Sequence, residues 1–322
     1  MELIPTEFRC NNRCVFCAQD GLSTEEFSKD EKDLVAKAKA ACQKDSKIAF
    51  VGGEPTLHEG LLAAVSAAKE SGAAYILIQT NARRLAYLSF AQNLKNAGAD
   101  ALDISLQGST GPMHDYHTQT PGSWAQTILG IKRAKETGFR IGISTVITRS
   151  NFRHLSEIAR LAQHLGAEAF HLSLALPYGR AAKSWARVIP LAEMARPHLT
   201  KALNLSKSLG LKTELGQALS ETSNPLFAGI GPHQRAELGT VPHSKELGTV
   251  PNSRPKPGLR ERRGPLKTGT ELKELFPEVF TGADIPGGKP SDGQHRLYSA
   301  RSALQSVLPL LLKPGNGIYA RR

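Results

Sequence analysis

The alternation of short apolar runs with amphipathic stretches constrains this chain more than any other feature. Six runs rich in β-branched residues fall at 2–8, 47–53, 73–80, 99–107, 139–148 and 167–177. Between them, stretches such as 32–44, 61–72 and 154–166 place apolar residues at helical spacing. A strand–helix–strand rhythm predicts a parallel sheet with right-handed crossovers. We therefore predict an α/β fold over residues 1–215, built as an open sheet or as a partial or complete barrel.

Residues at the ends of the predicted helices support this rhythm. A left-handed residue that closes a helix is usually glycine, and four glycines come just before the next predicted strand: Gly72, Gly98, Gly138 and Gly166. Helix starts are indicated by a Ser or Thr followed three residues later by Glu or Gln, as in Ser28…Glu31, Thr56…Glu59 and Ser123…Gln126.

The composition changes after about residue 215. Residues 216–293 contain 22 Gly or Pro among 78 residues, and "ELGTVPHSK" is followed at once by "ELGTVPNSR". Such density without a collagen period is typical of low-complexity, disordered segments. We predict a core domain at 1–215 and a low-complexity tail at 216–322, with one short helix at 297–312.

Composition excludes several classes of protein. No apolar run approaches the 18 residues or so that a membrane helix needs, and the N-terminus lacks the pattern of a signal peptide. Four clustered cysteines are a poor disulfide framework and favour a reducing cytoplasm. The net charge of +12 is spread thinly along the chain, so binding to nucleic acid is not supported.

The stretch "CNNRCVFC" at 10–17 carries the clearest chemical signal. Cys10, Cys14 and Cys17 lie on a polar loop, where thiolates bind soft metals and iron–sulfur clusters. The remaining cysteine, Cys42, lies among alanines in a predicted helix and is expected to pack there. A zinc site is the alternative, but it would want a fourth Cys or a His, and none occurs between Cys17 and His58.

Two motifs together resemble the radical S-adenosylmethionine (radical SAM) family. The spacing C-x3-C-x2-C carries an aromatic residue, Phe16, before the third cysteine, and "GGEP" follows the second predicted strand at 52–55. The resemblance implies a partial (βα)6 TIM-like barrel and one 4Fe–4S cluster on Cys10, Cys14 and Cys17. It also implies that SAM fills the position that a fourth cysteine would otherwise occupy.

The resemblance further implies which residues contact SAM. Gly52, Gly53 and Glu54 would hold its amino group, and Thr80 and Ser105 would lie against its ribose and carboxylate. All of them follow successive predicted strands, and ligands of parallel α/β folds bind where the strands end. Arg149, after the fifth strand, is a further candidate for the SAM carboxylate.

The implied reaction is reductive cleavage of SAM to methionine and a 5′-deoxyadenosyl radical, which abstracts hydrogen from a substrate. It requires an electron donor such as flavodoxin or ferredoxin, and the substrate, whether peptide, nucleoside or small metabolite, is not indicated. Residues 114–117 form either a substrate contact or a solvated loop, and His171 has no assigned role. Two alternatives stay open: a degenerate member that binds cluster and SAM without turnover, and a zinc-stapled binding module.

Overall fold

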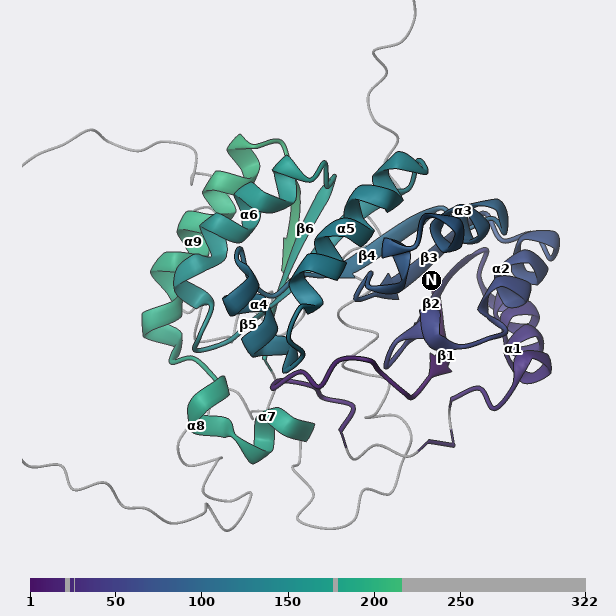
Figure 1. The fold of residues 1–322 in the computed structure, drawn as a ribbon, viewed down its shortest axis with the longest axis horizontal. Coiled ribbons are helices and arrows are strands. Elements are labelled where there is room, and N and C mark those ends of the chain that lie inside the picture. The colour runs from purple at the N-terminus through teal and green to yellow at the C-terminus, as the bar shows by residue number, and fades with distance from the viewer. Residues whose placement is uncertain (21–23, 26, 176–178, 216–322) are drawn as a thin grey trace, which may run out of the picture. The chain divides into compact units, whose positions relative to one another are not determined.

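The structure is a computed structural model that describes residues 1–20, 24–25, 27–175 and 179–215 (Figure 1). The predicted tail at 216–322, with its helix at 297–312, lies outside the described residues. The domain boundary at 215 therefore stays a prediction.

The described residues form one parallel sheet whose strands follow each other in chain order. The seven strands are β1 (Glu2–Glu7), β2 (Lys47–Gly52), β3 (Tyr75–Thr80), β4 (Ala101–Ser105), β5 (Arg140–Ile147), β6 (Ala169–Leu174) and β7 (Lys212–Leu215). The parallel TIM-like α/β fold is as predicted, and six of the strands fall on the predicted runs. The seventh was not predicted, because "KTEL" is short and only its last residue is apolar.

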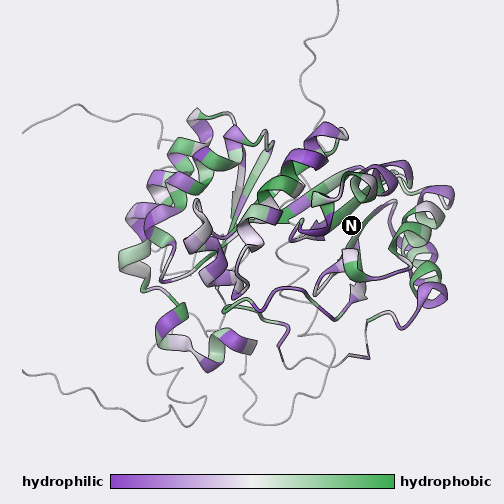
Figure 2. Ribbon diagram, in the orientation of Figure 1, coloured by the Kyte–Doolittle hydropathy of each residue, from purple (hydrophilic) through white to green (hydrophobic). Residues whose placement is uncertain are grey.

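Helices connect consecutive strands and lie along the outer side of the sheet (Figure 1). The α-helices are α1 (Glu31–Lys44), α2 (Leu61–Glu70), α3 (Leu88–Asn96), α4 (Gly111–Thr118), α5 (Ser123–Glu136), α6 (Leu155–His164), α7 (Gly179–Lys183), α8 (Trp185–Val188) and α9 (Ala192–Ser208). Short 3-10 helices are η1 (Pro55–Leu57), η2 (Arg84–Ala86) and η3 (Phe152–His154). Figure 2 shows hydrophobic residues on the strands and mixed polarity on the helices, as amphipathic helices covering a sheet require.

The helix ends agree with the sequence better than the helix starts do. All four predicted closing glycines have positive φ: Gly72, Gly98, Gly138 and Gly166. The three predicted capping boxes are wrong. Asp30 caps α1 by accepting from Asp33 N, whereas α2 and α5 begin after Gly60 and Gly122 without a side-chain cap.

The inner face of the sheet changes from apolar to polar along the strands. Towards its amino end it is filled by a buried cluster: Leu3, Ala49, Val51, Tyr75, Leu77, Ala101 and Ala169. Side chains two residues further along a strand point to the same face, and there Gln79, Asp103 and His171 follow Leu77, Ala101 and Ala169. The polar end of the barrel interior is therefore the carboxyl end of the strands. Among the described residues, no helix has the length and apolar character needed to cross a membrane.

Candidate functional site

A pocket of about 560 Å³ opens at the carboxyl edge of the sheet, within the size range of small-molecule sites. The loops after β1, β2 and β3 and the ends of β4, β5 and β6 supply its walls. With the exception of Arg149, the residues predicted for the cluster and SAM site line it: Cys10, Cys14, Phe16, Cys17, Gly52, Gly53, Glu54, Thr80 and Ser105. The structure thus brings the predicted residues to one place, which a single cofactor site requires.

The cysteine loop, residues 8–20, is fixed to the carboxyl end of α4 by its main chain. Arg13 N donates to Thr118 O at 2.8 Å, and Val15 N donates to His117 O at 2.9 Å. These bonds satisfy carbonyls that the end of a helix leaves without intrahelical partners. They hold the middle of the loop, on either side of Cys14, against a rigid element.

Burial raises the pKa of two of the three thiols. It raises the pKa of Cys10 to about 11, with the Glu54 carboxylate and the Cys17 thiol adding in the same direction, and it also raises the pKa of Cys14. A bound metal must therefore displace thiol protons. Across the described part of the chain, no three His, Cys, Asp or Glu side chains converge on a point as ligands of a single ion would. An iron–sulfur cluster attaches its thiolates to separate irons, so three thiols on one pocket wall fit such a group.

Gly52 and Gly53 allow two backbones to pass each other closely. A Cβ at Gly53 would lie 2.3 Å from Phe8 O and 2.5 Å from Arg9 O, and one at Gly52 would lie 2.4 Å from a backbone oxygen of β1. Glu54 N then donates to Arg9 O at 2.9 Å. The two glycines therefore fit the "GGEP" segment against the start of the cysteine loop, in addition to exposing backbone to the pocket.

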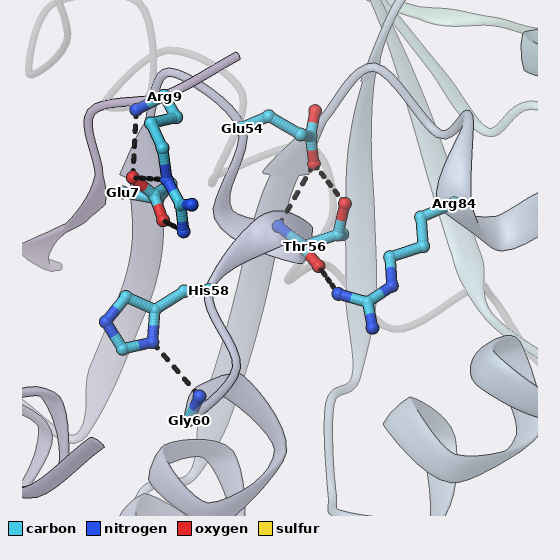
Figure 3. Close-up of polar contacts among 7 residues, drawn as sticks. All are labelled: Glu7, Arg9, Glu54, Thr56, His58, Gly60 and Arg84. Atoms are coloured by element: carbon cyan, nitrogen blue, oxygen red, sulfur yellow. Dashed lines mark hydrogen bonds and ion pairs between the residues drawn. The ribbon is translucent and has the colours of Figure 1, made fainter. Parts of the chain in front are cut away.

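Glu54 ties the loop after β2 to the loop after β3. Glu54 is 1% exposed, and its Oε1 accepts from Thr56 N at 3.1 Å and from Thr56 Oγ1 at 2.6 Å (Figure 3). The same oxygen accepts from Thr80 Oγ1 at 2.7 Å. Oε2 accepts from Asn81 N at 2.7 Å. Burial raises the pKa of Glu54, and these donors oppose the rise. Figure 3 also shows Arg84 of η2 donating to Thr56 O, so that a second residue following β3 bonds to the segment after β2.

Thr80 and Ser105 differ in how far their hydroxyls are already engaged. The Thr80 hydroxyl donates to Glu54 and accepts from Ala82 N at 3.0 Å. Ser105 forms no side-chain hydrogen bond to the described residues and lines the pocket. Of the two, Ser105 offers the hydroxyl better suited to bind a ligand, and Thr80 serves mainly to orient the Glu54 carboxylate.

Asn81, the first residue after β3, is a junction of three segments. Its Nδ2 donates to Asn11 Oδ1 at 2.6 Å and lies 3.9 Å from Cys10 Sγ. Its main-chain oxygen accepts from Thr127 Oγ1 of α5 at 3.0 Å, while its N–H binds Glu54. Asn81 thereby joins the cysteine loop to the "GGEP" segment and to α5.

A polar layer crosses four strands beneath the pocket. Asp103 accepts from Gln79 Nε2 at 3.3 Å and from Ser144 Oγ at 2.5 Å, and that hydroxyl lies 3.3 Å from His171 Nδ1. Burial raises the pKa of Asp103 to about 6, although the hydrogen bonds from Ser144 and Gln79 act to lower it. Burial also lowers the pKa of His171 to about 4. Gln79, Ser144 and His171 line the pocket, so its floor carries hydrogen-bonding groups and a neutral imidazole.

Other candidates from the sequence lie off the pocket lining. Residues 114–117 belong to α4 rather than to a solvated loop, and Asp115 accepts from the first residues of α5, including Trp124 N at 2.8 Å. Arg149 donates to Ala186 O at 2.7 Å and does not line the pocket. The Cys42 thiol lies 3.6 Å from a carbonyl of α2, in keeping with a packing role.

The pocket residues that were not singled out in the sequence include Ser144, Ser173 and Arg180. The two serines occupy inward positions of predicted strands, so alternation along β5 and β6 could have found them. Arg180 belongs to α7, which has five residues, too few for helical periodicity to show.

A parallel sheet with a lined pocket at its carboxyl edge defines an α/β protein of the class that binds ligands where its strands end. Residues 4–162 match the family model of the radical SAM superfamily. The chain belongs to this superfamily, and membership implies the use of SAM and an iron–sulfur cluster.

Curated relatives carry more than one name. The chain is 30% identical over 187 residues to the AdoMet-dependent heme synthase of Oleidesulfovibrio alaskensis, covering 57% of this chain and 47% of that protein. It is 31% identical over 174 residues to the probable GTP 3′,8-cyclase of Metallosphaera sedula, covering 53% of this chain and 54% of the cyclase. The chain thus spans about half the length of the curated relatives it matches.

Solved structures share the fold at low identity. Streptococcus suis SuiB bound to S-adenosylmethionine superimposes with a TM-score of 0.53 at 16% identity, covering 66% of this chain and 49% of SuiB. Coproporphyrinogen III oxidase from Escherichia coli, a radical SAM enzyme, gives a TM-score of 0.50 at 15% identity, covering 65% of this chain and 52% of the oxidase.

Proposed function

We propose that this chain is a radical SAM enzyme whose Cys10, Cys14 and Cys17 hold one 4Fe–4S cluster with a coordination position left for SAM. The observation that carries this proposal is the shared lining. Three thiols, Phe16 and five of the predicted SAM contacts surround one pocket, although they come from four separate segments of the chain. When bound, cluster and SAM supply one-electron cleavage of the S–C5′ bond and hydrogen abstraction from a substrate.

The residues of the chain position these groups and exclude water from them. The "GGEP" segment receives the SAM amino group through its exposed backbone and Glu54 Oε2, which has one hydrogen bond from the described residues. Ser105 contacts the ribose or carboxylate, and Phe16 forms an apolar part of the wall. A low-potential donor such as flavodoxin or ferredoxin delivers the electron.

The substrate class stays open among peptides, nucleosides and small metabolites. Relatives at about the same identity are named for a heme synthase and for a GTP cyclase, so relatedness does not choose between them. The polar floor formed by Gln79, Ser144 and His171 favours a substrate that presents hydrogen-bonding groups.

The first experiment tests the ligand set. After anaerobic reconstitution, the wild type should be brown and contain about four irons and four sulfides per chain. Cys14→Ala should lose the cluster absorbance, and Cys42→Ala, the matched control, should keep it. A colourless wild type that retains zinc would support the zinc-stapled module instead.

The second experiment tests turnover without a known substrate. The reconstituted protein is reduced with dithionite in the presence of SAM, and 5′-deoxyadenosine is measured by chromatography. Product from the wild type and none from Cys14→Ala supports a radical SAM enzyme. A protein that holds both cluster and SAM yet forms no product would be the degenerate binding protein.

A further inference from the structure

Helix α7 is distant from the cysteine loop in sequence but lies beside it in the structure (Figure 1). Arg180 N donates to Cys17 O at 3.0 Å, and Arg180 Nη1 donates to Cys14 O at 3.3 Å. Gly179 has φ +54, and a Cβ there would lie 2.3 Å from Cys17 O. Arg180 is therefore hydrogen-bonded to the main chain of two of the three predicted cluster ligands, through its guanidinium at Cys14 and through its main-chain N–H at Cys17.

Arg180 is the least exposed cation among the described pocket-lining residues. Its side chain is 33% exposed, whereas Arg9 is 73% exposed and paired with Glu7, and Arg13 is also exposed. One carboxylate balances it: Asp20 Oδ1 lies 3.5 Å from Arg180 Nε. The same carboxylate accepts from Lys183 Nζ at 2.5 Å. A half-buried positive charge with a partial counter-charge thus stands at the cysteine loop.

A fixed positive charge beside the cysteine loop affects how readily a cluster bound there accepts an electron. Reduction of a bound cluster adds one negative charge to the pocket, and a nearby cation stabilises the reduced form more strongly inside a protein than in water. Net charge and hydrogen bonding around a cluster are among the features that set its reduction potential. A neutral side chain at position 180 would withdraw this stabilisation, and a neutral side chain at position 20 would increase it.

We propose that Arg180 is a positioning residue that raises the reduction potential of the cluster, with Asp20 opposing it. The inference rests on the proposed function, since it requires Cys10, Cys14 and Cys17 to hold a cluster. Arg180 both hydrogen-bonds to the cysteine loop and places a positive charge beside it. The same side chain therefore fixes the ligands and favours reduction of the cluster.

The test is a potentiometric titration of the reconstituted full-length chain, followed by electron paramagnetic resonance of the reduced cluster. Arg180→Gln keeps a donor for Cys14 O but removes the charge, so its midpoint potential should be more negative than that of the wild type. Arg180→Lys keeps the charge and should restore most of the potential. Asp20→Asn should shift the potential in the positive direction.

Arg149→Gln is the matched control, because Arg149 also donates to a main-chain carbonyl, Ala186 O of α8, but does not line the pocket. Its potential should equal that of the wild type. If all variants load their cluster with unchanged potentials, this inference is overturned and the proposed function stands. If Arg180→Gln loads no cluster, Asp20→Asn decides: a positive shift supports the inference and no shift overturns it. A wild type that takes up no cluster overturns both.

Discussion

At the scale of single residues, adding one methyl group at Gly53 should damage the site. A Cβ there would lie 2.3 Å from Phe8 O, and backbone cannot move aside as a side chain can. Gly53→Ala should cost ~1–3 kcal/mol of stability, as overpacking does, and should lower both iron content and SAM affinity. Iron assay and isothermal titration with SAM measure the two losses.

Gly111→Ala is the control for Gly53→Ala, since a Cβ at Gly111 would meet only Trp124 at 3.8 Å, an ordinary contact. That variant should bind iron and SAM like the wild type. Unchanged SAM affinity in Gly53→Ala would remove the "GGEP" segment from the site. A loss of SAM affinity with full iron content would show that position 53 touches the ligand without supporting the cysteine loop.

Asp103 should make the protein less stable as pH rises. Burial raises the pKa of Asp103 from 3.8 to about 6, so the folded state binds more protons than the unfolded chain between these values. The free energy of unfolding therefore falls as pH increases through this window, by at most about 3 kcal/mol, and the loss persists above pH 6 or so.

Asp103→Asn removes this titration while leaving amide groups to pair with Ser144 and Gln79. The free energy of unfolding is measured with urea on metal-free protein at several pH values from 5 to 8. The variant should become more stable relative to the wild type as pH rises, and the difference should then stay constant. A difference that does not change with pH would mean that the Asp103 carboxyl titrates normally.

At the scale of elements, α7 should determine how long the site keeps its metal. Gly179 is left-handed and packs against Cys17 O, so Gly179→Ala combines backbone strain with a clash that pushes α7 off the cysteine loop. Gly210 is also left-handed, at φ +73, but a Cβ there would meet nothing within 4 Å. Iron release to a chelator should be faster in Gly179→Ala than in Gly210→Ala. Equal rates would mean that α7 does not retain the cluster.

The same scale shows why some elements could be predicted from sequence and others could not. Strands such as β3 are buried on both sides and read as continuous apolar runs, which a single sequence reveals. Helix starts were mispredicted because a motif such as Thr56…Glu59 specifies local hydrogen bonds, while tertiary contacts decided otherwise. Thr56 lies in η1, and its hydroxyl is used by Glu54. Helix α4 was not predicted because its pairing with the cysteine loop is a long-range contact.

The site, too, has features that local sequence reveals and features that depend on long-range contacts. The cysteines and "GGEP" are contiguous motifs, and the rule that ligands bind at strand ends predicted that they would share a pocket. Asn81 and Arg180 act through partners far away in sequence, Asn11 and Cys14, so no local pattern marks them. The Arg149 assignment relied on position after a strand, but its side chain donates to Ala186 O of α8 instead.

At the scale of the whole molecule, the described core should carry the cofactor chemistry alone. Within the part of the chain that the structure describes, residues 1–215 supply seven strands, the lining of the pocket and the contacts of α4 and α7 that hold the cysteine loop. A chain shortened to end at residue 215 keeps β7, whose pairing with β6 completes the sheet. We expect it to unfold in one cooperative transition and to bind iron and SAM with the stoichiometry and affinity of the full chain. Circular dichroism, iron assay and isothermal titration check the three expectations, and the same shortened chain carrying Cys14→Ala controls for adventitious iron. If the shortened chain folds but no longer binds SAM, residues 216–322 contribute to the site and the predicted domain boundary is wrong.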